Sequence, residues 1–351
     1  MCAIFFLLFV SNSSFAQSGR IKPTETPAPT PRPNVVYIPS EKISATQKPT
    51  PTDTSPKIET EEDGEIISVE SNLVPIPVSV LDAQGRAVTN LKLTDFELAI
   101  DGQRKEISEI SRSETPVRLA LLFDNSSSVT TAREFEKKAA IRFFKRVVRP
   151  EKDLAALFSV STGTRLEQTL TKDISQIITA IENFPPPAGA TALLDAIIKA
   201  ADYLKTADGR RVIVIVSDGE DTISDATFEE TVRAAQASNC QIYVVKTKDF
   251  ENFKQTGQRG GNANIRILAA ERRMQELAAQ TGGTVYSPID EDELDRAFNQ
   301  ISAELSQAYV LSYYPENEKD KRGEFRTISL KVKTRENLTV RTRKGYYVPR
   351  R

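Results

Sequence analysis

The chain carries five oxygen-bearing side chains at positions where a parallel sheet could bring them together. Asp124, Ser126 and Ser128 form the pattern D-x-S-x-S directly after the apolar run RLALLF. Thr191 lies where the segment PPPAGATALLDA passes from a loop into a helix, and Asp218 follows the apolar run VIVIVS. Open parallel sheets bind ligands at the carboxyl ends of their strands, so we expect the three segments to converge there.

The residue types at these positions suit a hard divalent cation, which prefers carboxylate and hydroxyl oxygens. The hydroxyls are neutral and leave much of the ion's charge uncancelled, and carboxylates that act through water do not quench it fully. Such an ion can still take a carboxylate from a partner protein as its last ligand. The sequence therefore predicts a site for Mg²⁺, or for Mn²⁺ or Ca²⁺, formed by Asp124, Ser126, Ser128, Thr191 and Asp218.

The elements that must position these residues alternate between apolar strands and amphipathic helices from residue 115 to residue 305. We expect strands at 118–123, 153–160, 210–217 and 241–247, and helices at 132–148, 192–205, 226–238, 265–280 and 291–305. Continuous apolar strands separated by helices indicate a mainly parallel sheet covered on both faces, which is a doubly wound α/β fold.

Residues 66–114 and 306–351 show short β-like runs instead, beginning with IISVE at 66–70. Neither region is long enough to form a comfortable sandwich alone. We therefore expect them to pair with each other into one small antiparallel β-sandwich, with the α/β unit inserted between them. Two separate β-ribbons packed on the α/β unit are the alternative.

The N-terminal region has the features of an export signal followed by a linker. A short apolar run is followed by Ser14 and Ala16, which predicts a signal peptide over residues 1–16. An uncleaved anchor is the alternative, but the run falls well short of the roughly 20 residues that span a bilayer. Residues 17–65 are rich in Pro and Thr and are expected to be a disordered linker. The mature protein would then have no transmembrane helix and would lie in a periplasm, outside the cell or on its surface.

Composition excludes several other classes of protein. Lysine and arginine total 47 against 48 aspartate and glutamate, so no net field favours nucleic acid. The chain of 351 residues has no histidine, which excludes Ser-His-Asp and Cys-His catalysis and any imidazole-bound zinc. Cys2 lies in the predicted signal peptide, so Cys240 would remain as a single thiol, expected to be a small buried hydrophobe. Oligomeric state is not fixed by the sequence.

The segments DNSSS, GAT and SDGED resemble the three loops of the metal-ion-dependent adhesion site of von Willebrand factor A and integrin I-type domains. The resemblance covers about residues 116–305. It implies that Ser126 and Ser128 bind the cation directly, and that Asp124, Thr191 and Asp218 bind it directly or through water. The flanking segments, among them YVLSYYP and RTRKGYYVP, resemble bacterial VWFA-related proteins of the Acidobacterial type, which supports export and a neighbouring β-sandwich.

These features favour an exported, metal-dependent protein-binding or adhesion module that is not an enzyme. A metal-assisted phosphoryl or ester hydrolase is the main alternative, with Asp124 as an aspartyl nucleophile. Phosphatases of the haloacid dehalogenase type carry a second aspartate two positions later, where this chain has Ser126. An envelope scaffold with an unused metal site is a third possibility.

Simpler roles exist for several of the same residues. Asp124 with Ser126 could form a helix N-cap and its neighbours, and Thr191 could likewise cap a helix. Asn125 and Ser127 could be turn residues. Glu220 and Asp221 are expected in a solvated turn, with a supporting role at the metal as the alternative.

The Gly-rich segment after residue 245 is the remaining candidate for partner contact. Its basic side chains could flank an acidic ligand, and a mobile insertion is the alternative. These side chains are Lys246, Lys248, Lys254 and Arg259.

Overall fold

The computed structural model describes residues 73–112, 115–130, 133–258, 265–315, 322–333 and 336–348. The predicted signal peptide (1–16), the predicted linker (17–65) and the strand expected at 66–70 lie outside the described residues. Within these ranges, no helix combines the length and the apolar character needed to cross a membrane.

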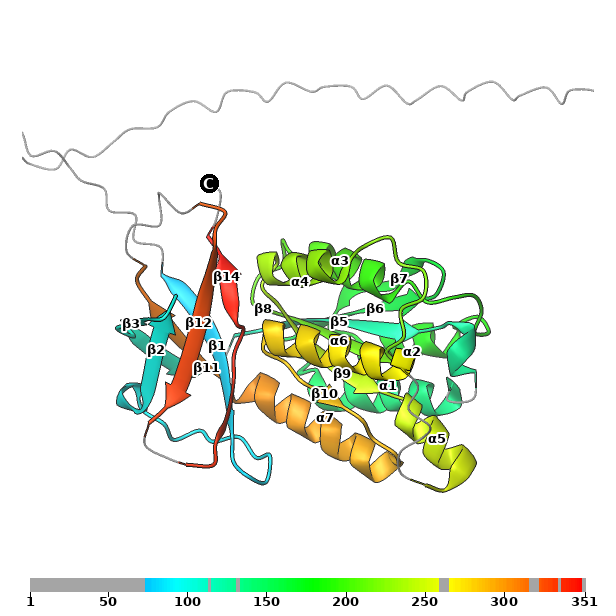
Figure 1. The fold of residues 1–351 in the computed structure, drawn as a ribbon. Coiled ribbons are helices and arrows are strands. Elements are labelled where there is room, and N and C mark those ends of the chain that lie inside the picture. The colour runs from blue at the N-terminus through cyan, green and yellow to red at the C-terminus, as the bar shows by residue number, and fades with distance from the viewer. Residues whose placement is uncertain are drawn as a thin grey trace, which may run out of the picture. The chain divides into compact units, whose positions relative to one another are not determined.

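The central element is a six-stranded sheet in the order β10-β9-β8-β5-β6-β7 (Figure 1). Neighbouring strands run parallel except β6 and β7, which are antiparallel. The strands are β5 (Val117–Asp124), β6 (Leu154–Val160), β7 (Thr164–Thr171), β8 (Arg210–Ser217), β9 (Cys240–Lys246) and β10 (Val285–Tyr286).

Helices cover both faces of this sheet because its strands are apolar on both sides. Leu121 and Phe123 of β5 lie in one core with α1, α2 and α7, whereas Ala120 and Leu122 lie in a second core with α3, α4 and α6. The doubly wound α/β class predicted from the sequence is confirmed. The helices are α1 (Arg133–Val147), α2 (Ile174–Glu182), α3 (Leu193–Leu204), α4 (Phe228–Ala237), α5 (Lys248–Thr256), α6 (Ile265–Thr281) and α7 (Glu291–Ser306).

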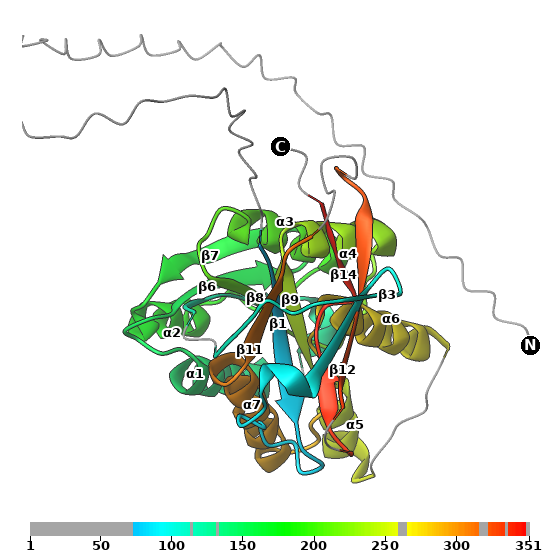
Figure 2. The same cartoon turned by 90° about the vertical axis from the view of Figure 1, so that its left-hand side faces the viewer.

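The regions before and after the α/β unit combine in two four-stranded antiparallel sheets. Their orders are β13-β1-β11-β4 and β14-β12-β2-β3, so each sheet mixes strands from both regions. Figure 2, which looks onto these sheets, shows β1 beside β11, as their pairing requires. The strands are β1 (Val74–Leu81), β2 (Phe96–Ile100), β3 (Gln103–Lys105), β4 (Glu109–Arg112), β11 (Tyr309–Tyr313), β12 (Phe325–Val332), β13 (Thr339–Arg341) and β14 (Gly345–Tyr347).

The α/β unit is inserted between two strands that pair with each other. It follows β4 and precedes β11, and Arg112 of β4 lies opposite Tyr309 of β11. The chain therefore leaves the sandwich and returns to it at neighbouring points. A buried polar cluster joins the α/β unit to the sandwich. In it the carboxylate of Glu304 on α7 accepts hydrogen bonds from Tyr243 (3.0 Å) and Tyr286 (3.1 Å) and pairs with Arg341 of β13.

Four elements of the α/β unit are not among those expected from the sequence, and one of them is the two-residue strand β10. The edge strand β7 is half-exposed and polar, with an irregular register against β6, so it shows no continuous apolar run. Helix α2 is only nine residues long. Helix α5 occupies part of the Gly-rich segment, where Phe250 stacks on Phe135 of α1 with ring centroids 3.4 Å apart.

Candidate metal centre

Asp124 and Ser217 end two neighbouring parallel strands, β5 and β8, and their side chains meet at the carboxyl edge of the sheet. The Ser217 hydroxyl donates to Asp124 Oδ2 at 2.6 Å, and the Ser126 backbone N–H donates to Asp124 Oδ1 at 2.9 Å. Ser217 also accepts the Gly219 N–H at 3.0 Å. Ser217 thus ties the first aspartate of the predicted site to the turn that carries the second, a role that sequence reasoning missed.

Ser126 and Ser128 bring their hydroxyl oxygens to within 2.9 Å of each other. Ser126 stands at the N-cap of a short 3₁₀ turn, η2 (Ser127–Val129), but its side chain makes no capping hydrogen bond. The capping role considered for Ser126 is therefore wrong. Adjacent ligands of an octahedral Mg²⁺, each at 2.0–2.1 Å from the ion, lie roughly 2.9 Å apart, so the two oxygens have the separation such an ion requires.

Thr191 is joined to the 217–224 loop through its backbone. Its N–H donates to Thr222 Oγ1 at 2.9 Å, and its carbonyl accepts the Thr222 N–H at 2.9 Å. The N-cap of α3 is Ala192 rather than Thr191. The capping role considered for Thr191 is therefore wrong too. Thr191 is 2% exposed, and its hydroxyl makes no hydrogen bond with any residue of the described ranges.

Asp221 supplies the cap that α3 needs. Its Oδ1 accepts the backbone N–H groups of Leu193 (2.8 Å) and Leu194 (3.2 Å). The sequence indicated a solvated turn for Glu220 and Asp221, and the Asp221 carboxylate is instead bound by a helix from another loop. A helix N-terminus favours a negative charge, so this contact fixes the Thr191 loop against the Asp218 loop.

Asp124 and Asp218 are both buried, and the negative charge of Asp218 acts on Asp124. The carboxylate of Asp218 accepts only the Glu220 N–H, at 3.0 Å, among the described residues. Burial, and then the negative charge of Asp218, raise the pKa of the Asp124 carboxyl to about 6. Two buried carboxylates that repel each other, beside three hydroxyls, are a donor set that fits a bound cation.

The first loop is also tied to the loop that precedes Thr191. The Ser127 N–H donates to the Gly189 carbonyl at 3.0 Å, and the Ala188 N–H donates to the Asn125 carbonyl at 2.9 Å. Gly189 has a φ of +81°, which disfavours other residues, and a Cβ there would collide with Thr162. Asn125 and Ser127 are thus turn residues whose backbones hold two loops together.

Arg133, at the start of α1, is a buried cation that braces the same two loops. Its guanidinium donates to the Asn125 side-chain oxygen and, at 2.8 Å, to the Pro185 carbonyl. It lies over the rings of Phe123 and Phe184, 5.3 and 5.5 Å from their centroids. Sequence reasoning missed this residue because one of its two hydrogen-bond partners, Pro185, lies 52 positions away in the chain.

All five residues predicted to bind the cation therefore lie on three mutually bonded loops, and none is fully exposed except Ser128. In the described ranges, no three or more His, Cys, Asp or Glu side chains are grouped so that they could hold a metal ion. The predicted donor set has two carboxylates and three hydroxyls, so that finding leaves it untested.

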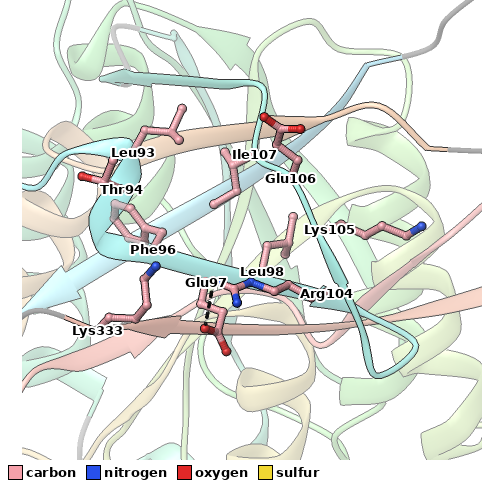
Figure 3. Close-up of a pocket in the computed structure, with 10 residues that line it drawn as sticks. All are labelled: Leu93, Thr94, Phe96, Glu97, Leu98, Arg104, Lys105, Glu106, Ile107 and Lys333. Carbon is pink, nitrogen blue, oxygen red and sulfur yellow. Dashed lines mark ion pairs between the residues drawn. The ribbon is translucent and has the colours of Figure 1, made fainter.

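A pocket of about 400 Å³ lies elsewhere, in the sandwich (Figure 3). Its lining combines four apolar side chains with five charged ones, of which Arg104 and Glu97 form an ion pair at 3.4 Å. None of the five predicted ligands lines it, and we assign it no function. The lining residues are Leu93, Thr94, Phe96, Glu97, Leu98, Arg104, Lys105, Glu106, Ile107 and Lys333.

Residues 119–220 match the family described as the von Willebrand factor type A domain. The matched segment contains all five predicted ligands. The chain therefore contains a domain of this type, as the resemblance of its three loops implied, and such a domain is consistent with protein binding or adhesion. A comparison with curated proteins gives no match.

Several solved structures are similar to this chain. The protein BatB from Bacteroides thetaiotaomicron is 15% identical, over 54% of this chain and 98% of its own, with a TM-score of 0.42. An aerotolerance-related membrane protein from Bacteroides fragilis is 19% identical, over 54% and 98%, with a TM-score of 0.41. The PilB minor pilin from Streptococcus sanguinis is 14% identical, over 55% and 62%, with a TM-score of 0.41.

Proposed function

We propose that this protein is an exported binding module that holds a divalent cation at Asp124, Ser126, Ser128, Thr191 and Asp218 and uses it to capture a carboxylate of a partner protein. The observation that carries the proposal is the joining of three loops, distant in sequence, at one sheet edge by the bonds of Ser217, Asp221 and Thr222. Fixed loops present oxygens to an ion at little cost in ordering.

The cation would supply an electrophilic centre for a partner's oxygen, while the chain's own residues hold the ligand oxygens in place. Ser217 orients Asp124, and Asp221 holds the loop of Thr191. The 2.9 Å separation of the Ser126 and Ser128 hydroxyls suits two neighbouring ligands of Mg²⁺, Mn²⁺ or Ca²⁺.

The contacts of Asp124 support binding rather than catalysis. Both of its carboxylate oxygens accept hydrogen bonds, from Ser126 and Ser217, which hold the carboxylate in place as a metal ligand. The second aspartate that phosphatases of the haloacid dehalogenase type carry two positions later is replaced by Ser126. The three loops also contain no histidine or lysine that could serve as a general base. The hydrolase is therefore the weaker proposal.

Export rests on the predicted signal peptide. Cleavage after Ala16 would make Gln17 the first residue of the mature chain, which N-terminal sequencing of the secreted protein would check.

The experiment for the site is calorimetric titration of MgCl₂ or MnCl₂ into the chelator-treated full chain. We expect one site in the native protein and at least about a tenfold loss of affinity in Asp124→Asn and Thr191→Val, because each removes a ligand oxygen. Asp225→Asn, an exposed residue beyond the site, serves as the matched control. Unchanged affinity in both site variants would exclude these residues as ligands.

A further inference from the structure

The three loops of the candidate metal centre contain no basic side chain. Residues 124–130, 183–192 and 217–224 include Asp124, Asp218, Glu220 and Asp221 but neither lysine nor arginine. A partner's carboxylate would thus meet no basic side chain on these loops, because the nearby Arg133 is buried and donates to Asn125 and Pro185. A second acidic group on the partner would gain nothing and would be repelled.

Three of the four basic residues predicted to flank an acidic ligand have other contacts in the structure. Lys246 is buried and pairs with Glu271 of α6 at 3.4 Å. The Lys254 ammonium lies 5.7 Å from the centre of the Phe250 ring, Lys248 has a partner of its own, and Arg259 lies outside the described residues. The described part of the segment therefore gives no support to recognition by a basic loop.

Exposed apolar groups, by contrast, are fixed beside the predicted ligands. Ile223 is 43% exposed, and its backbone N–H donates to the carbonyl of Thr191 at 3.3 Å, which places it at the rim beside Thr191. On the other side, Pro185 and Ala188 are exposed, while Arg133 holds the Pro185 carbonyl and the Ala188 N–H donates to Asn125. Two rigid apolar surfaces thus adjoin the site.

We infer that the partner of this site is a peptide segment with a single carboxylate set among apolar side chains, which pack on Ile223 and on the Pro185–Ala188 loop. The inference rests on the proposed function, because the carboxylate is to be held by the cation. Side chains that are already fixed lose little entropy on binding, and burying them removes exposed apolar area from water.

The test uses three labelled peptides and the full chain in MgCl₂, with binding followed by fluorescence anisotropy. The first peptide has one glutamate between leucine and valine residues, the second has serines in place of these, and the third has a run of aspartates. We expect the first to bind at least about fivefold more tightly than the second, and the third to bind no better than the second. Chelator should abolish binding of the first peptide.

Ile223→Ser should weaken the first peptide about fivefold and leave the second unchanged. Tyr314→Ser, which removes a 53% exposed side chain in the sandwich, is the control and should change neither. Cation affinity, measured separately by calorimetry, should be the same in both variants, which shows that the site remains intact.

Two failures can be told apart. If peptides bind only with the cation but without preference for apolar neighbours, or if the aspartate run binds best, the inference is overturned while the proposed function stands. If none of the peptides needs the cation, both are overturned.

Discussion

The two ends of the central sheet differ in whether their buried carboxylates have basic side chains as partners. At the amino ends of β8 and β9, Glu304 has Arg341 and two tyrosine hydroxyls, and the Arg210 guanidinium has Gln241 and the Glu304 carbonyl. At the carboxyl ends, Asp124 and Asp218 have backbone N–H groups and a serine hydroxyl but no basic side chain. At the first end the buried charges are neutralised by side chains of the protein itself, and at the second end the proposed cation would supply the positive charge.

The largest effect is expected where an internal partner is removed. Arg341→Met should lower the free energy of unfolding by about 3 kcal/mol, because it leaves the buried carboxylate of Glu304 without its counter-ion. Denaturant unfolding would measure this. Lys331→Met, at an exposed lysine on β12, is the control. If both variants lose the same free energy of unfolding, Arg341 is not needed as a counter-ion and the difference between the sheet ends does not hold.

A smaller loss is expected from the brace of the metal loops. Arg133→Gln should cost about 2 kcal/mol, because the Pro185 carbonyl and Asn125 lose a charged donor. It should also weaken Mg²⁺ binding, which Arg146→Gln, an exposed position on the same helix, should not do. Unaltered cation affinity in Arg133→Gln would mean that the loops hold their shape without the brace.

Removing a carboxylate at the carboxyl edge should have the opposite sign. In chelator, Asp218→Asn should stabilise the protein by roughly 1 kcal/mol, because it relieves repulsion with the buried Asp124 carboxylate. The same variant should lose the rise in melting temperature that MgCl₂ gives the native chain. Glu220→Gln is the control, and a destabilised Asp218→Asn protein in chelator would contradict this account.

The smallest effect concerns Cys240, at the amino end of β9. Burial raises the pKa of its thiol to about 12 from an ordinary 9.0. The folded protein therefore keeps this proton between pH 9 and pH 12 while the unfolded chain loses it, so this thiol lowers stability as pH rises through that window. A thiol reagent at pH 8 should label Cys240 only after unfolding, and rapid labelling of the native protein would show that the thiol is accessible.

Much of this arrangement could be predicted because it follows from local pattern. The apolar runs of β5 and β8 predict buried parallel strands, and strand ends must meet at one edge, which places Asp124 near Asp218. Cys240 is buried as its residue type suggested. The doubly wound sheet and its antiparallel neighbour follow from the same periodicities.

The remainder depends on contacts between distant segments. Nothing near Asp221 shows that its carboxylate will cap a helix that begins 28 residues earlier, at Leu193. Arg133 looks like an ordinary residue in the first turn of a charged helix, and Ser217 like the last residue of a strand. Helix α5 could not be predicted from its polar segment, because the stacking of Phe250 on Phe135 joins two separate parts of the chain.

The pairing of β4 with β11 has a mechanical consequence. Because the inserted unit leaves and rejoins the sandwich at opposed residues, tension applied along β1 and β12 would be borne by hydrogen bonds within the two antiparallel sheets. The inserted α/β unit would bear little of this tension, so the loops of the proposed metal site would keep their geometry while the two antiparallel sheets are loaded.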